Sequence, residues 1–199
     1  MDTKQRIIEE SLNLFLHYGI KSITMDSISE TLGISKRTIY ELFKDKDDLL
    51  KNCIEYKIIE SEKENQEIIK NSENVIDAFL THIKRNVEMM KVINPLFFFD
   101  AKKYHPEVFK LTGQEHKNKG CKQIIELVSQ GKKDGFIRSE VNEDIIAKLI
   151  TEQFKILGND DLFPPDKYSK SEIFENIAVN FIRGIATEKG LAVVNKHRF

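Results

Sequence analysis

Apolar residues recur at intervals of three and four along most of this chain, which is the period of an amphipathic α-helix. The first stripe, formed by Ile8, Leu12 and Phe15, ends before Gly19, and a second runs from Met25 to Leu32. The same pattern predicts helices at about 36–43, 46–69, 73–92, 114–134, 143–157 and 170–188, and a short one that starts at Pro95. We therefore expect an all-α protein.

Two of these helices are short and lie very close together. Thr24 is a hydroxyl N-cap candidate for the first, and Gly33, directly after its last apolar residue, suits the left-handed conformation that often ends a helix. Ser35 can cap the second helix. A connection of only three residues, 33–35, has the length found in the helix-turn-helix motif that reads DNA.

The second short helix has distinct inner and outer faces. If Ile39 points to the core, then Arg37, Thr38, Tyr40 and Glu41 lie on the outer face and its flanks. Arginine can bond a guanine edge twice, threonine can contact a base or a thymine methyl, and glutamate can accept from cytosine. A tyrosine hydroxyl suits a phosphate oxygen. The alternative interpretation is an ordinary solvated helix surface in some other helical protein.

The overall charge does not itself point to nucleic acid, because the 199 residues carry a formal net charge of −1. A DNA-binding charge must therefore be local. Lys36 precedes the outer face of the second short helix, and Lys44 and Lys46 follow it, so all three are placed to neutralise phosphates beside a groove.

Other classes of protein find little support in the chain. It has no apolar run long enough to span a membrane and no secretory signal at Met1, so we expect a cytoplasmic protein. Glu115 and His116 with Cys121 come nearest to metal-ligand spacing, but they lack the paired arrangement of zinc sites. With no nucleophile, phosphate-loop or dinucleotide motif either, we expect no enzyme activity, no metal and no cofactor.

The segment GISKRTIYELFKDKDDLL, residues 33–50, resembles the DNA-binding domain of the tetracycline-repressor (TetR) family of bacterial regulators, and the likeness covers residues 3–50. Glu41 and Leu42 depart from the commonest pattern, which has aromatic or histidine residues there. The resemblance implies two sets of contacts to double-stranded DNA. Phosphates would be bound by Thr24, Ser35, Tyr40 and Lys46, and the major groove would be faced by Lys36, Arg37, Thr38 and Glu41.

The resemblance also implies a division into a helix-turn-helix domain, residues 1–47, and a helical ligand-sensing and dimerisation bundle, residues 48–199. An apolar or amphipathic effector would bind among aromatic side chains of the bundle, although core packing explains the same residues equally well. The candidates are Phe79, Phe97, Phe98, Tyr104, Phe109 and Phe154.

The last two long helices are apolar over more than one narrow stripe, so they are either core helices or an interface. The resemblance favours a homodimer through Ile146, Ile150, Ile177 and Phe181. A dimer also fits DNA, because two recognition helices about 34 to 36 Å apart match successive major grooves. We expect a ligand-responsive repressor on a palindromic operator; the alternative is a helical ligand carrier or interaction protein that does not bind DNA.

Overall fold

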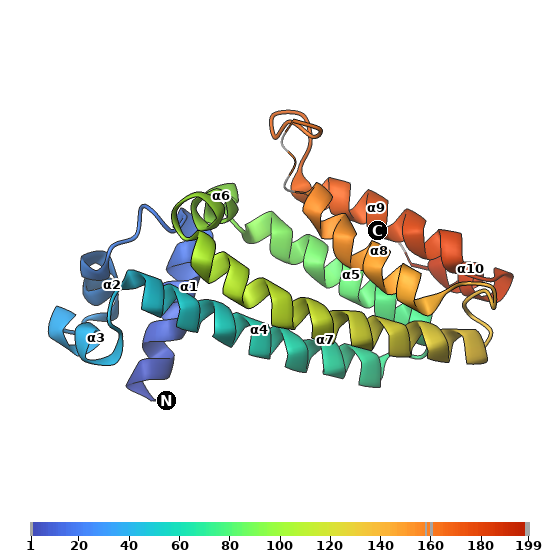
Figure 1. Ribbon diagram of the computed structural model, residues 1–199, viewed down its shortest axis with the longest axis horizontal. Coiled ribbons are helices and arrows are strands. Elements are labelled where there is room, and N and C mark those ends of the chain that lie inside the picture. Colours follow the sequence, from blue (N-terminus) through green and yellow to red (C-terminus); the bar gives the residue numbers. More distant parts are fainter. Residues whose placement is uncertain (1, 158, 160, 198–199) are drawn as a thin grey trace. The chain divides into compact units, whose positions relative to one another are not determined.

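The computed structural model describes residues 2–157, 159 and 161–197, apart from the side chains of residues 109–119, 154 and 155. The described chain is helical, as the spacing of apolar residues predicts (Figure 1). The helices are α1 (Thr3–Tyr18), α2 (Met25–Leu32), α3 (Lys36–Leu42), α4 (Lys46–Asn71), α5 (Val75–Val92), α6 (Pro95–Tyr104), α7 (Pro106–Lys133), α8 (Glu143–Ile156), α9 (Lys170–Ile185) and α10 (Glu188–Val194). No helix in this part of the chain is long and apolar enough to cross a bilayer.

The helices pack into two compact units. The first unit contains the chain up to Lys63 together with Val92–His116, and the second unit contains Glu64–Lys91 together with the chain from Lys117 onward. The first unit therefore includes α6, which lies far from α1–α3 in sequence. The predicted functional division after residue 47 stays a prediction, since packing separates the chain inside α4.

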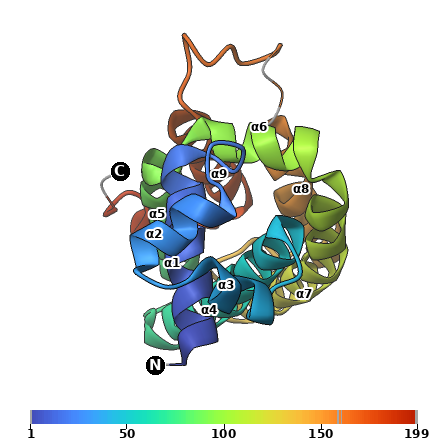
Figure 2. The same ribbon diagram turned by 90° about the vertical axis from the view of Figure 1, so that its left-hand side faces the viewer.

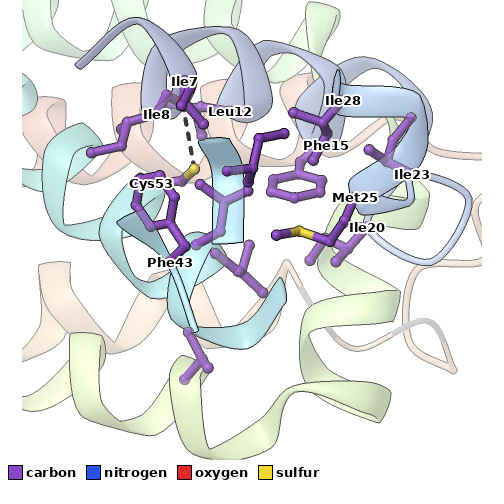
Figure 3. Packing of buried hydrophobic residues seen from close by; sticks show 14 of the residues in the cluster. Ile7, Ile8, Leu12, Phe15, Ile20, Ile23, Met25, Ile28, Phe43 and Cys53 are labelled. Carbon is purple, nitrogen blue, oxygen red and sulfur yellow. Dashed lines mark hydrogen bonds between the residues drawn. The ribbon is translucent and has the colours of Figure 1, made fainter. Parts of the chain in front are cut away.

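The first unit has its own hydrophobic core (Figure 3). The apolar stripes of the first three helices are buried; the set is Ile8, Leu12, Phe15, Ile28, Leu32, Ile39 and Phe43. Cys53 on α4 completes the core, and its Sγ donates to the Ile8 carbonyl, shown as a dashed line in Figure 3. Burial raises the pKa of the Cys53 thiol to about 12, so this cysteine is a packing residue rather than a nucleophile.

The second unit has a separate core formed by α5, the C-terminal part of α7, α9 and α10. Gly131 on α7 sits where a Cβ would lie 2.6 Å from a methyl group of Val75, so only glycine fits this crossing. Thr187 caps α10, and its hydroxyl also donates to the Gly135 carbonyl. These contacts hold the C-terminal segment on the turn after α7.

Two helix boundaries differ from the sequence prediction. The helix expected at about 114–134 begins at Pro106, because this proline occupies the first helical position just as Pro95 does in α6. The helix expected to run to 188 ends at Ile185, where Ala186 becomes extended and pairs with Ile137. The short helix α10, which starts at Glu188, was not predicted.

Candidate nucleic-acid interface

The two short helices are each fixed by a hydroxyl cap. Thr24 Oγ1 accepts from the backbone N–H of Ser27 at 3.1 Å, and Ser27 Oγ accepts from the backbone N–H of Thr24 at 2.9 Å. This reciprocal pair is a capping box. Ser35 Oγ accepts from the backbone N–H of Thr38 at 3.1 Å, which starts α3 at the predicted residue.

The turn between α2 and α3 has the geometry that the glycine implied. Gly33 is left-handed, with φ 65° and ψ 32°. The backbone N–H of Ile34 donates back to the Ser29 carbonyl, and Arg6 on α1 donates to the Leu32 carbonyl at 3.1 Å. The last carbonyl groups of α2 thus accept hydrogen bonds from the backbone and from a side chain. These bonds fix the direction in which the chain enters α3.

Helix α3 presents the expected outer face. Ile39 is fully buried under the helix, whereas Tyr40 is exposed and the Arg37 side chain is 87% accessible. Lys36 and Glu41 are exposed beside them, and Thr38 is half-buried. Figure 2 shows α3 and α2 on the side of the first unit that faces the viewer. The side chains proposed to face the major groove therefore share one accessible helix surface.

Two of the basic side chains on this surface are paired with carboxylates. Lys36 pairs with Asp26 of α2, and Arg37 Nε lies 2.8 Å from Glu41 Oε1 one turn later. The hydrogen bond to Asp26 raises the pKa of Lys36, so this ammonium stays charged at neutral pH. Because both ion pairs are exposed to water, they contribute little to stability, and DNA phosphates and bases can compete for the cations.

Lys46 is placed differently from the other predicted phosphate contacts. Its Nζ donates to the Ile20 carbonyl and lies 5.9 Å from the centroid of the Phe15 ring. Burial lowers the pKa of Lys46, against the opposing effect of Asp100 and Asp47. This ammonium points toward the body of the first unit. Thr24 and Ser35 remain exposed while their hydroxyls serve as caps.

The candidate effector residues lie in different surroundings. Phe79 is buried in the second core, Phe97 packs against the first core, and Phe98 and Tyr104 are exposed. The side chains of Phe109 and Phe154 lie outside the described residues. A cavity of about 450 Å³ lies between α4 and α5, away from these candidates, and its lining includes Glu64, Asn71, Asp77, Thr81 and Arg85.

The candidate dimer residues on α8 and α9 are all half-buried. Ile146 and Phe181 pack against the second core, and Ile150 and Ile177 are also half-buried. Among the described side chains of α8, the most exposed apolar ones are Ile145 at 55% and Leu149 at 48%, which the predicted dimer residues did not include. Their spacing of four residues puts them on one face of α8, a signal that was present in the sequence but could not be separated from core packing.

Sequence reasoning also missed three structural partners of the interface. Asp26, which pairs with Lys36, was not predicted as its partner, and Ser27 was not identified as the second half of the capping box. Arg6 had no predicted role. The hydroxyl pair three residues apart could have revealed the box, whereas the other two contacts depend on packing of separate helices.

Among the described residues, no group of three or more histidine, cysteine or acidic side chains is arranged to hold a metal ion. The comparison with known proteins agrees with the DNA-reading geometry. Residues 7–53 match the family model of bacterial regulatory proteins of the tetR family.

Similarity extends over nearly the whole chain in three further proteins. The HTH-type transcriptional regulator YvaF of Bacillus subtilis is 24% identical, with 93% of this chain and 96% of that protein covered. The crystal structure of a transcriptional regulator from Cytophaga hutchinsonii has a TM-score of 0.73 at 19% identity, covering 92% of this chain and 98% of that one. A regulator from Saccharomonospora viridis, crystallised in complex with choline, has a TM-score of 0.71 at 17% identity, covering 93% and 98%.

These similarities agree with the cap, turn and core geometry of α1–α3. They set aside the alternative of a helical carrier without a role in DNA binding. Residues 7–53 form a DNA-binding domain of the tetracycline-repressor family, and the chain as a whole is similar to DNA-binding transcriptional regulators.

Proposed function

We propose that the protein is an effector-responsive repressor that binds a palindromic operator as a homodimer. The observation that carries the DNA-reading part is the outer face of α3, where Arg37, Thr38, Tyr40 and Glu41 stand over a buried Ile39. A helix that is anchored on one side and polar on the other can enter a major groove without exposing its core.

In this proposal Arg37 reads a base and Tyr40 contacts a phosphate. Arg37 is the most exposed member of the charged pairs on α2 and α3. Because its Nε is held by Glu41, its two terminal amino groups remain available for a guanine edge. Thr24, Ser35 and Lys36 lie at helix starts, where backbone N–H groups also favour phosphates.

Dimerisation is supported by the outer surface of α8. Ile145 and Leu149 lie four residues apart on one face of α8 and are both exposed. Exposed apolar side chains that gather on one surface are a feature of interfaces. Helix α9 packs beside α8 and contributes Ile177. Gly184 on α9 has open space where a Cβ would stand, so another helix can approach it closely.

Effector response is supported by the family and by the choline complex of the Saccharomonospora viridis regulator. We propose a small apolar or amphipathic effector that binds the C-terminal helical bundle. A ligand can release the operator only if it prefers the conformation that does not bind DNA, and such couplings are typically about 1 to 3 kcal/mol.

One set of measurements tests the whole proposal. Fluorescence anisotropy with duplexes from the region upstream of the gene should find a sequence that binds at least about 1,000-fold tighter than unrelated DNA at the same salt. Light scattering should give a dimer in both free and bound states. A compound screen by thermal shift should find ligands that stabilise the protein and weaken operator binding. The operator should weaken binding of each such ligand by the same factor. A protein that stays monomeric on DNA, or stabilising ligands that leave operator affinity unchanged, would refute the corresponding part.

A further inference from the structure

One peptide group in the connection between α1 and α2 is held from both sides. The Ile20 carbonyl accepts from Lys46 Nζ, at the start of α4. The N–H of the same peptide group, which belongs to Lys21, donates to Asp100 Oδ2 of α6 at 2.7 Å. A single peptide plane is thus bonded to two helices through charged side chains, and charge-assisted bonds of this kind are the stronger ones.

The burial of these groups makes the arrangement costly to break. Asp100 is only 5% exposed, and a buried carboxylate is destabilising unless its charge is compensated. The charges of Asp100 and Lys46 are close enough that Asp100 counteracts the effect of burial on the pKa of Lys46. Each charged group therefore has a hydrogen bond to the backbone and an opposite charge nearby.

A second set of bonds joins α6 to the end of α1. Asn94 is the N-cap of α6, where its Oδ1 accepts from the Leu96 N–H at 2.9 Å. The same side chain donates to the His17 carbonyl at 3.0 Å, and its backbone N–H donates to the Leu16 carbonyl at 2.8 Å. One residue thus caps the start of α6 and the end of α1, whose last carbonyls have no partner within the helix.

The approach of α6 also explains the glycine at the end of α1. Gly19 has φ 82°, and a Cβ there would lie 3.0 Å from Leu96 Cβ and 3.1 Å from Asp100 Oδ2. Its ψ of 160° lies outside the left-handed helical region that Gly33 adopts. Gly19 therefore allows α6 to approach the end of α1 closely, and it also allows the chain to turn there.

We propose that Asp100 and Lys46 are positioning residues for DNA binding, which fix the α1–α2 connection, and with it the helix-turn-helix, to α6 and α4. Lys46 acts through the Ile20 carbonyl rather than through a phosphate. The inference rests on DNA binding by α3, but it requires neither a dimer nor an effector.

The experiment compares Lys46→Gln and Asp100→Asn with the parent and with Lys44→Gln. Lys44 is an exposed lysine two residues before Lys46 that is expected to neutralise a phosphate, so Lys44→Gln is the reference for loss of such a contact. Glutamine at position 46 is neutral but still carries a donor. Affinity for the cognate duplex is measured by anisotropy across a salt titration, and exchange of the Lys21 amide is followed by NMR or mass spectrometry on the full chain. Circular dichroism verifies that each variant is folded.

We expect Asp100→Asn to weaken cognate binding at least tenfold and to accelerate exchange of the Lys21 amide. Lys46→Gln should weaken binding with an unchanged salt slope, whereas removal of a phosphate contact lowers the slope by about 0.9. The double variant should bind no more weakly than the weaker single variant, because both bonds act on one peptide group.

Two results would overturn the inference. A slope that falls by about 0.9 in Lys46→Gln, with Lys21 exchange unchanged, would make Lys46 a phosphate contact. Parent-like DNA affinity in Asp100→Asn, despite faster exchange, would show that the bond positions nothing that DNA binding needs. If Asp100→Asn fails to fold, Asp100→Glu, which keeps the charge, takes its place. This variant must show weaker cognate binding and faster exchange of the Lys21 amide, each to a smaller extent. If the parent does not bind DNA at all, the proposed function fails. The exchange measurement still tests whether Lys46 and Asp100 hold the peptide group between Ile20 and Lys21.

Discussion

The two units of this molecule use their polar residues in different ways. In the first unit, polar side chains fix the backbone: Thr24 and Ser35 cap helices, and Asp100 holds a loop amide. In the second unit, the cavity between α4 and α5 is lined by charged and amide side chains, and α8 exposes apolar ones. The first unit is thus built to hold one geometry, whereas the second offers surfaces that a ligand or a partner can cover.

This difference suggests that the two units contribute separately to stability and to function. The first core and the second core share no buried residue. Substitutions in the first core should therefore abolish DNA binding because the first unit unfolds. Substitutions on the surface of the second unit should weaken DNA binding while the protein stays folded. Four predictions test this contrast, from the largest expected effect to the smallest.

The largest effect is expected from Phe15→Ala, because Phe15 is fully buried at the centre of the first core. Loss of a buried phenyl ring costs about 3 to 5 kcal/mol. Urea unfolding followed by circular dichroism should show an early transition that accounts for part of the helical signal and abolishes DNA binding. Phe79→Ala, the matched change in the second core, should instead shift the other transition. A single coincident transition in both variants would break the comparison and make the protein one cooperative unit.

The next effect concerns the exposed apolar side chains on α8. Leu149→Glu should give a folded monomer, since it places a charge in the centre of the proposed interface, and binding of a palindrome should weaken about 100-fold or more as avidity is lost. The measurement is light scattering combined with anisotropy on a full operator and on a half-site. Lys148→Gln is the control, because Lys148 is exposed on the same helix and pairs with Asp144. A dimeric Leu149→Glu protein would place the interface elsewhere.

Base reading by α3 should show a moderate and local effect. Arg37→Ala is expected to cost about 1 to 3 kcal/mol on the cognate site and to relax preference at one base pair of each half-site. Glu41→Gln, which loses the partner of Arg37, should relax the same base pair less strongly. Selection from a randomised DNA library measures both. The assignment fails if Arg37→Ala returns the same preferred sequence as the parent.

Much of the first unit could be predicted from its sequence because its signals are local. A cap, a left-handed glycine and an apolar period each act within a few residues, so α2, the turn at Gly33 and α3 followed directly from the chain. What the sequence could not supply was the pairing of distant residues. The contacts of Asp100 with Lys21 and of Lys46 with Ile20 join residues 79 and 26 positions apart.

The second unit was harder to predict for a physical reason. A helix that is apolar on two faces gives the same sequence pattern whether the second face meets the core or a partner. Ile146 packs on the core while its neighbour Ile145 is exposed, a distinction that depends on the rotation of α8. The break at Ala186 likewise depends on pairing with Ile137, which no local rule anticipates.

The smallest predicted effect is a pH dependence that belongs to the second unit. Burial lowers the pKa of His82 on α5 below its usual 6.5. In the unfolded chain this histidine binds a proton at a higher pH than in the folded protein, so folding stability is complete above about pH 6.5 and is lost as the pH falls toward the folded pKa. Carboxylates such as Glu143, whose pKa lies below 4.5, titrate at lower pH than this window. Urea unfolding at pH 7.5 and 5.5 should therefore show a drop in the parent that is smaller in His82→Gln. The drop should follow the transition of the second unit, identified by Phe79→Ala, and an equal drop in parent and variant would assign the acid sensitivity to other groups.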